Sequence, residues 1–144
     1  MGDTDTAAWA ALLRVHAALV PRMDRELQQQ CGLPLTWYDV LLELNSAPDR
    51  RLSMGRLGEV VVVSRTRVSR VVDQLVTAGL VRRETNPEDK RSAYAVITDD
   101  GRKTLRAAAP VYLAAIERYY TSRMTAAETR TVAAALEKVL AAEL

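Results

Sequence analysis

The chain has 144 residues, of which 49% are hydrophobic and 26% charged, with one histidine, one cysteine and a formal net charge of +2. This length fits one compact domain with its own core, and a single cysteine excludes an internal disulfide framework and suits a reducing compartment. No apolar run approaches the roughly 18 residues that a membrane-spanning helix needs, and the acidic, polar N-terminus is neither a signal peptide nor a transit sequence. We therefore expect one cytoplasmic globular domain.

The charge is distributed unevenly along the chain. Residues 50–106 contain 13 Lys and Arg against 7 Asp and Glu. The remaining residues contain 7 Lys and Arg against 11 Asp and Glu. A basic middle between acidic ends is typical of a nucleic-acid-binding segment carried on flanks that do not bind. Chance clustering on a solvated surface is the alternative that charge alone leaves open.

A long first helix is expected over residues 5–30, because apolar side chains recur there at the spacing of one helix face. Pro21 should kink this helix, because proline removes a backbone donor. Cys31, Gly32 and Pro34 should end it. The apolar stripe consists of Trp9, Leu12, Leu13, His16, Leu19, Val20, Met23 and Leu27.

Two short helices should follow. The run TWYD has the spacing of a capping box, which predicts a second helix from Thr36 to about Ser46, before Pro48. Ser53 can cap a third helix that ends near Val60.

A fourth helix should run from about Ser64 to Gly79, a residue suited to a left-handed C-terminal cap. At 100° per residue, its packing face consists of Val68, Val71, Val72, Leu75 and Val76. The opposite face carries Thr66, Arg70, Asp73 and Thr77, with Arg67 and Ser69 at its edges.

The third and fourth helices, joined by a tight connection, match a helix-turn-helix, whose second helix puts its N-terminal residues into the major groove. Arginine reads guanine and neutralises phosphate, while hydroxyl side chains reach phosphate or base edges. Arginines kept on a surface helix for solubility are the alternative, but the helix dipole disfavours cations at a helix start. The candidate DNA contacts in this helix are Ser64, Arg65, Thr66, Arg67, Ser69 and Arg70.

A charged β-hairpin should come next, with strands over residues 80–84 and 93–97. Its tip, residues 86–91, is too polar to pack inside the protein. A hairpin directly after such a helix is typical of the wing of a winged helix-turn-helix. Lys90 and Arg91 at the tip complete the candidate DNA contacts, and Arg91 suits insertion into a narrow minor groove.

Two further helices should close the chain. Thr98 opens one that ends near Arg123 and is irregular near Pro110, and the run TAAE at residues 125–128 is a second capping box. The terminal segments carry apolar stripes that one small lobe cannot cover, which predicts two intertwined chains.

Several phrases resemble the MarR (multiple antibiotic resistance regulator) family of transcriptional regulators over residues 9–140: LTWYDVLLEL, SRTRVSRVVDQLVTAGLVRRE, DKRSAYAVIT and ITDDGRKTL. The resemblance implies a mainly α fold with a small hairpin wing. Residues 35–98 would form a winged helix lobe, and residues 5–34 and 99–144 the dimerisation helices. It also implies a homodimer on a pseudo-palindromic DNA site, with Arg91 in the minor groove and Asp89 supporting the wing through an ion pair.

Most members of that family respond to a small, often aromatic or phenolic molecule, which predicts a ligand-responsive repressor. A wall formed by Trp9, His16, Trp37 and Tyr38 would suit an aromatic anion, with His16 as a donor. The alternative is that Trp9 and His16 only pack in the dimer interface.

Two other functions are weaker alternatives. Cys31 invites comparison with the hydroperoxide sensors of the same family, but those carry their reactive cysteine early in the first helix, and Val40 takes the place of a partner tyrosine. A winged helix can also act as a protein-interaction module. No phosphate-binding loop, nucleophile elbow or metal-ligand cluster is present, so we expect neither an enzyme nor a metal or other cofactor.

Overall fold

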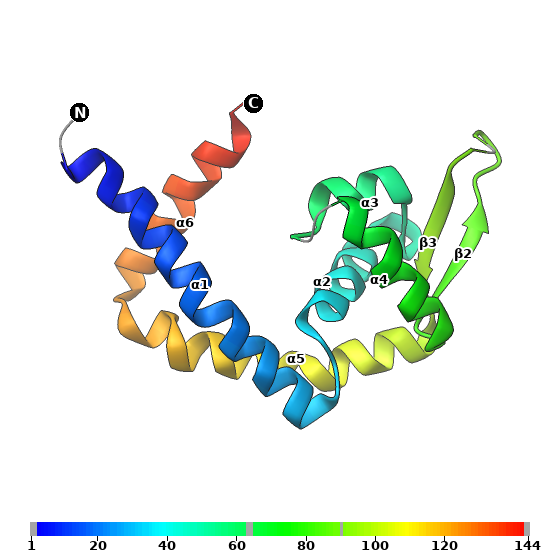
Figure 1. Ribbon diagram of the computed structural model, residues 1–144, viewed down its shortest axis with the longest axis horizontal. Helices are drawn as coiled ribbons and strands as arrows, with labels where there is room; N and C mark the ends of the chain where they lie inside the picture. Colours follow the sequence, from blue (N-terminus) through cyan, green and yellow to red (C-terminus); the bar gives the residue numbers. More distant parts are fainter. Residues whose placement is uncertain (1–2, 63–64, 90, 143–144) are drawn as a thin grey trace. The chain divides into compact units, whose positions relative to one another are not determined.

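The computed structural model describes residues 3–62, 65–89 and 91–142 (Figure 1). The chain forms two compact units: one contains Asp24–Val111, and the other contains Met1–Met23 with Tyr112–Leu144. No helix in the described ranges is long and apolar enough to cross a membrane. The fold is mainly α with a small antiparallel sheet, which confirms the predicted class.

The Asp24–Val111 unit, which we call the lobe, contains the helices α2 (Leu35–Ser46), α3 (Met54–Val60) and α4 (Arg65–Thr77). Its sheet has the order β1-β3-β2, with strands β1 (Arg51–Ser53), β2 (Val81–Thr85) and β3 (Ala93–Ile97). The β2–β3 hairpin pairs Val81 with Ile97 and Thr85 with Ala93. This hairpin lies beside α4 and confirms the predicted wing strands (Figure 1).

Strand β1 was not predicted from the sequence. It is three residues long, too short to show an alternating pattern, and it pairs Leu52 with Ala95 on β3. A 3-10 turn over Pro48–Arg50 leads into it, with Asp49 and Arg50 at positive φ. These two non-glycine residues turn the chain back from the end of α2 onto the edge of the wing.

The core of the lobe is formed by α2, α3, α4, the end of α1 (Asp3–Cys31) and strand β3. Its fully buried side chains include Leu27, Val40, Leu41, Leu44, Leu57, Val72, Leu75 and Ala95. Val68 and Val71 of the predicted packing face of α4 are also buried. Val76, expected on that face, is 38% exposed because it lies at the edge of the apolar stripe.

Three of the four predicted helix caps form in the structure. Ser53 caps α3 by accepting the backbone N–H of Arg56 at 3.1 Å, and Gly79 adopts a φ of 78° after α4. Thr125 and Glu128 form the complete capping box that opens α6 (Ala126–Ala141). All three predictions are confirmed.

The capping box predicted at Thr36 is wrong. Helix α2 begins one residue earlier, after the extended Pro34, which makes no side-chain cap. The carboxylate of Asp24 accepts the backbone N–H of Leu35 at 2.9 Å instead. A residue eleven positions away therefore supplies the cap, and the Asp39 carboxylate, expected in the box, is used elsewhere.

The second unit consists of the first part of α1 (Asp3–Cys31), the end of α5 (Asp99–Tyr119), a 3-10 turn over Thr121–Arg123, and α6. Both α1 and α5 continue through their internal prolines, Pro21 and Pro110. Many large apolar side chains of this unit are exposed in the single chain, namely Trp9, Leu12, Leu13, Val15, Leu113, Val139 and Leu140.

Candidate nucleic-acid interface

Helix α4 is held against the lobe by its apolar stripe and by the turn that precedes it. Val72 and Leu75 are fully buried, which fixes the rotation of the helix about its axis. The Asp39 carboxylate of α2 accepts the backbone N–H of Val62 at 2.8 Å, at the point where the chain leaves α3. These contacts leave the exposed face of α4 pointing away from the core.

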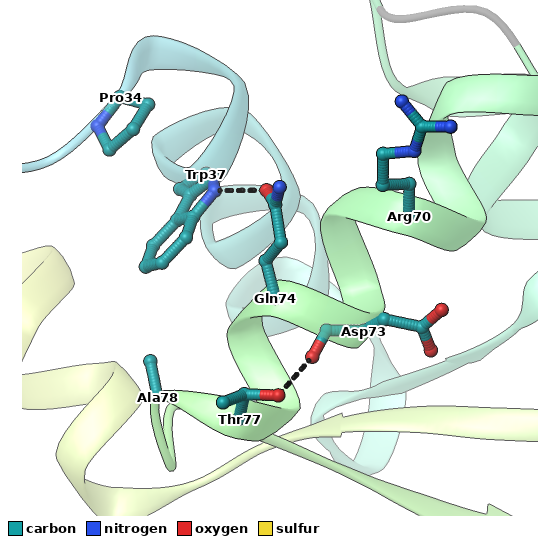
Figure 2. A pocket seen from close by; sticks show the side chains of 7 residues that line it. All are labelled: Pro34, Trp37, Arg70, Asp73, Gln74, Thr77 and Ala78. Carbon is teal, nitrogen blue, oxygen red and sulfur yellow. Dashed lines mark hydrogen bonds between the residues drawn. The ribbon is translucent and has the colours of Figure 1, made fainter.

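The exposed face of α4 has two flanks. At 100° per residue, Arg67, Arg70 and Gln74 lie on one flank, and the Trp37 indole N–H donates to the Gln74 side-chain oxygen at 3.1 Å there. Ser69 and Asp73 lie on the other flank, where Asp73 pairs with Arg83 of β2 at 2.8 Å. Figure 2 shows the Trp37–Gln74 pair on one side of the helix and the Asp73 carboxylate directed away from it.

The arginines of the lobe divide into paired and unpaired groups. The paired ones are Arg51 and Arg82 with Glu84, Arg56 with Glu59, Arg83 with Asp73, and Arg102 with Asp99. No ion pair joins Arg67, Arg70 or Arg91 to another described residue, and all three are exposed. The same holds for Arg25, Arg50 and Arg106, which lie outside α4 and the wing. Unpaired cations on α4 and on the wing are free to neutralise phosphate.

The other predicted DNA contacts are Ser64, Arg65, Thr66, Ser69 and Lys90. Ser64 and Lys90 lie outside the described residues. Arg65 is the first residue of α4, but its side chain also lies outside the described part of the structure. Thr66 and Ser69 are exposed on α4, on the same side of the lobe as Arg70.

The tip of the wing is held by local hydrogen bonds. The Asp89 carboxylate accepts the backbone N–H of Arg91 at 3.0 Å, and the Asn86 side chain accepts that of Glu88 at 3.0 Å. Asp89 forms no ion pair with any described residue, and the side chains of Arg65 and Lys90 lie outside the described part of the structure, so the ion pair that the resemblance implied stays a prediction. Asp89 fixes the backbone that presents Arg91.

Two shallow grooves border α4. One, of about 620 Å³, lies between Pro34 and Trp37 on one side and Arg70, Gln74 and Ala78 on the other (Figure 2). The second, of about 530 Å³, lies between α3, α4 and the wing, and Ser69, Arg83 and Arg91 contribute to its lining. Both grooves therefore carry unpaired arginines at their edges.

The four residues expected in a ligand wall have different surroundings. Trp9 is 62% exposed on α1, and His16 is exposed on the same helix. Trp37 is half-buried at its groove, whereas Tyr38 is buried in the core of the lobe, where burial raises the pKa of its hydroxyl. Tyr38 therefore supports the lobe rather than an open wall.

Asp39 and Glu43 are two carboxyl groups of the lobe whose pKa values are shifted by their surroundings. Burial raises the pKa of the Asp39 carboxyl, and the hydrogen bond from Val62 opposes that shift. Burial also raises the pKa of Glu43, as does Asp39, while Arg56 lowers it. The sequence did not predict the contact between Asp39 and Val62, because Val62 lies 23 residues away, just after the end of α3.

No three His, Cys, Asp or Glu side chains cluster as metal ligands within the described ranges. Cys31 is the last residue of α1 and is half-buried, with a free thiol.

Comparison with known proteins identifies the family. The family model described as "MarR family" matches residues 32–92. Sco3205 of Streptomyces coelicolor, a MarR family transcriptional regulator solved in complex with DNA, is 30% identical and superimposes with a TM-score of 0.87. That match covers 100% of this chain and 96% of Sco3205. The chain belongs to the MarR family.

Other MarR proteins are similar as well. AbsC of Streptomyces coelicolor is 28% identical, with a TM-score of 0.84, over 97% of this chain and 94% of AbsC. The HTH-type transcriptional regulator YkoM of Bacillus subtilis is 33% identical over 90 residues, which are 62% of this chain. This chain spans 57% of the length of YkoM. The winged helix fold of this MarR protein is thus shared along its whole length with Sco3205.

Proposed function

We propose that this MarR protein is a sequence-specific, double-stranded-DNA-binding transcriptional regulator and not an enzyme. The observation that carries the proposal is the position of three exposed arginines, Arg67 and Arg70 on α4 and Arg91 on the wing, none of which forms an ion pair with another described residue. Other arginines of the lobe, such as Arg51 and Arg82, form ion pairs with an acidic side chain of the protein itself. Sco3205, which is similar over the full length of this chain, was solved in complex with DNA, and this supports DNA binding by this protein.

The protein acts as a homodimer on a pseudo-palindromic site, with residues 5–34 and 99–144 as dimerisation helices. Helix α6 has no buried residue in the single chain, although Val139 and Leu140 are large and apolar. Two copies of such helices can cover one another's apolar faces. Each dimer then presents two copies of α4 to half-sites roughly 34–36 Å apart, one turn of DNA.

DNA binding is tested by fluorescence anisotropy with duplexes from the region that flanks the gene, followed by selection from a random pool. We expect salt-dependent binding, because phosphate contacts release counterions. Arg70→Ala should cost about 1–3 kcal/mol on the selected duplex and relax its sequence preference. Arg102→Ala, which removes a paired arginine of the same lobe, is the matched control. Failure of the wild-type protein to bind any duplex would leave the winged helix as a protein-interaction module.

The regulator represses until a small aromatic or phenolic acid binds. Two exposed residues of the terminal unit, Trp9 and His16, offer a ring surface and a donor for such a ligand. In the lobe, Trp37 offers a ring surface on an open groove, and Tyr38 is buried in the core. A ligand releases DNA only if it binds the free and DNA-bound conformations with different affinity.

This control is tested with salicylate, which should quench tryptophan fluorescence and weaken DNA binding. Both effects should be smaller in His16→Ala. A His16→Ala variant that binds DNA and responds to salicylate as the wild type does would make His16 a packing residue only.

A further inference from the structure

Helix α4 carries one acidic residue, Asp73, on the face proposed to meet DNA. Asp73 lies three residues after Arg70, so the two side chains emerge one turn apart on the same exposed face. A carboxylate at this position repels the phosphates that Arg70 would attract. Its presence therefore calls for a physical reason.

The ion pair of Asp73 with Arg83 contributes little to the stability of the fold. The Asp73 side chain is 64% exposed and its partner Arg83 is 40% exposed, and ion pairs this accessible contribute little to folding. The pair instead determines which charges the lobe presents. Without Asp73, Arg83 would join Arg67, Arg70 and Arg91 as a further unpaired cation beside DNA.

The position of Arg83 makes this consequence specific. Arg83 lies on β2 opposite Ala95 of β3, and it contributes with Ser69 and Arg91 to the groove between α4 and the wing. Its strand neighbours Arg82 and Glu84 pair with each other at 3.0 Å. Arg83 alone of the β2 arginines reaches across to α4.

We propose that Asp73 is a specificity-determining residue: its carboxylate neutralises Arg83 and keeps phosphates away from the wing-side flank of α4. The proposal rests on the proposed DNA-binding function. Phosphate contacts carry no sequence information, so an added free cation strengthens binding to every duplex, including wrong ones. Asp73 thus lowers the affinity for non-specific DNA and leaves recognition to Arg67, Arg70 and the wing.

The test compares Asp73→Asn, Arg83→Gln and the double variant on two probes. One probe is the duplex that the wild-type protein selects from a random pool, and the other has the same composition in shuffled order. Asp73→Asn should bind the shuffled duplex about fivefold more tightly, with a salt dependence steeper by roughly 0.9 for each bound chain. Binding to the selected duplex should change less, so the ratio of the two affinities falls. The double variant should return both quantities to the wild-type values.

Glu59→Gln is the matched control. It makes the same change in net charge and frees Arg56 in the same lobe, on α3 rather than on α4 or the wing. An equal gain in affinity from Glu59→Gln would show a general charge effect and overturn the proposal. Thermal melting confirms that each variant is folded.

Three other results would also overturn it. Unchanged affinity of Asp73→Asn for the shuffled duplex, with weaker binding by Arg83→Gln, would show that Arg83 contacts phosphate despite its pairing. Loss of affinity by Asp73→Asn for the selected duplex alone would show that Asp73 accepts a hydrogen bond from a base. If the wild-type protein binds neither probe, the proposed DNA-binding function is wrong, and so is this role of Asp73.

Discussion

The lobe and the unit formed by the terminal segments differ in where their apolar side chains lie. Apart from Met23 and Ala115, every buried apolar residue of the described chain belongs to the Asp24–Val111 lobe. The terminal unit instead exposes a tryptophan and several leucines and valines. The lobe therefore has a core within one chain, whereas the terminal helices leave apolar side chains exposed, which supports the proposed dimer.

The largest effect should come from removing one side of that interface. Deletion of residues 124–144 takes away α6 and should leave insoluble or unfolded protein, because the apolar faces of α1 and α5 then lose their cover. The isolated fragment 24–111, by contrast, should melt cooperatively, as circular dichroism would show. A clean, folded monomer from the α6 deletion would contradict this division of the chain.

A matched pair of substitutions sharpens the comparison. Leu12 of α1 and Leu42 of α2 are each 39% exposed in the single chain. Leu12→Asp should weaken self-association by about 3 kcal/mol or more, because it buries an unpaired charge in a dimer. Leu42→Asp should change stability by only about 0.5–1 kcal/mol. Sedimentation equilibrium measures self-association. Equal self-association of the two variants would contradict the proposed difference between the terminal unit and the lobe.

Within the lobe, the wing should contribute affinity rather than sequence preference. Arg91→Ala should weaken binding to selected and shuffled duplexes alike and flatten the salt dependence by about one unit of slope. The measurement is a salt titration of duplex binding. If neither affinity nor slope changes, the wing does not contact DNA.

The smallest effect concerns the turn before α4. Asp39→Ala removes the acceptor of the Val62 N–H and should destabilise the lobe by about 1 kcal/mol. Asp39→Asn keeps an acceptor but cannot titrate. Burial raises the pKa of Asp39, so the protonated form favours the folded state, and that stability is lost as pH rises through the folded pKa.

Relative to wild type, Asp39→Asn should therefore gain stability as pH rises above about 4, the ordinary pKa of an aspartate. Urea unfolding at a series of pH values checks the sign. A difference in stability that stays constant with pH would show that burial does not shift this carboxyl.

Two similar sequence patterns adopt different structures in this protein. The capping boxes at Thr36 and at Thr125 look alike in the sequence, yet only the second forms. Thr125 follows an extended residue and has no competitor for the N-terminus of α6, whereas α2 receives its cap from Asp24. The order of helices, the wing strands and the exposed arginines are local properties, and the sequence predicts them.

What the sequence did not reveal depends on contacts between distant residues. Strand β1 exists only because β3 offers it an edge, and the Asp39–Val62 and Asp73–Arg83 contacts join different elements. Asp73 was placed correctly on the outer face of α4, but its partner on β2 could not be read from helical periodicity. These non-local contacts decide which charges of the lobe remain unpaired.

The most direct test of the account is native mass spectrometry of the protein with the duplex that it selects. We expect one complex that contains two chains of 15.9 kDa on a single duplex, and no stable complex with one chain. Binding of a single folded chain to that duplex with the same affinity, or absence of any complex, would contradict the proposal of a DNA-binding dimer.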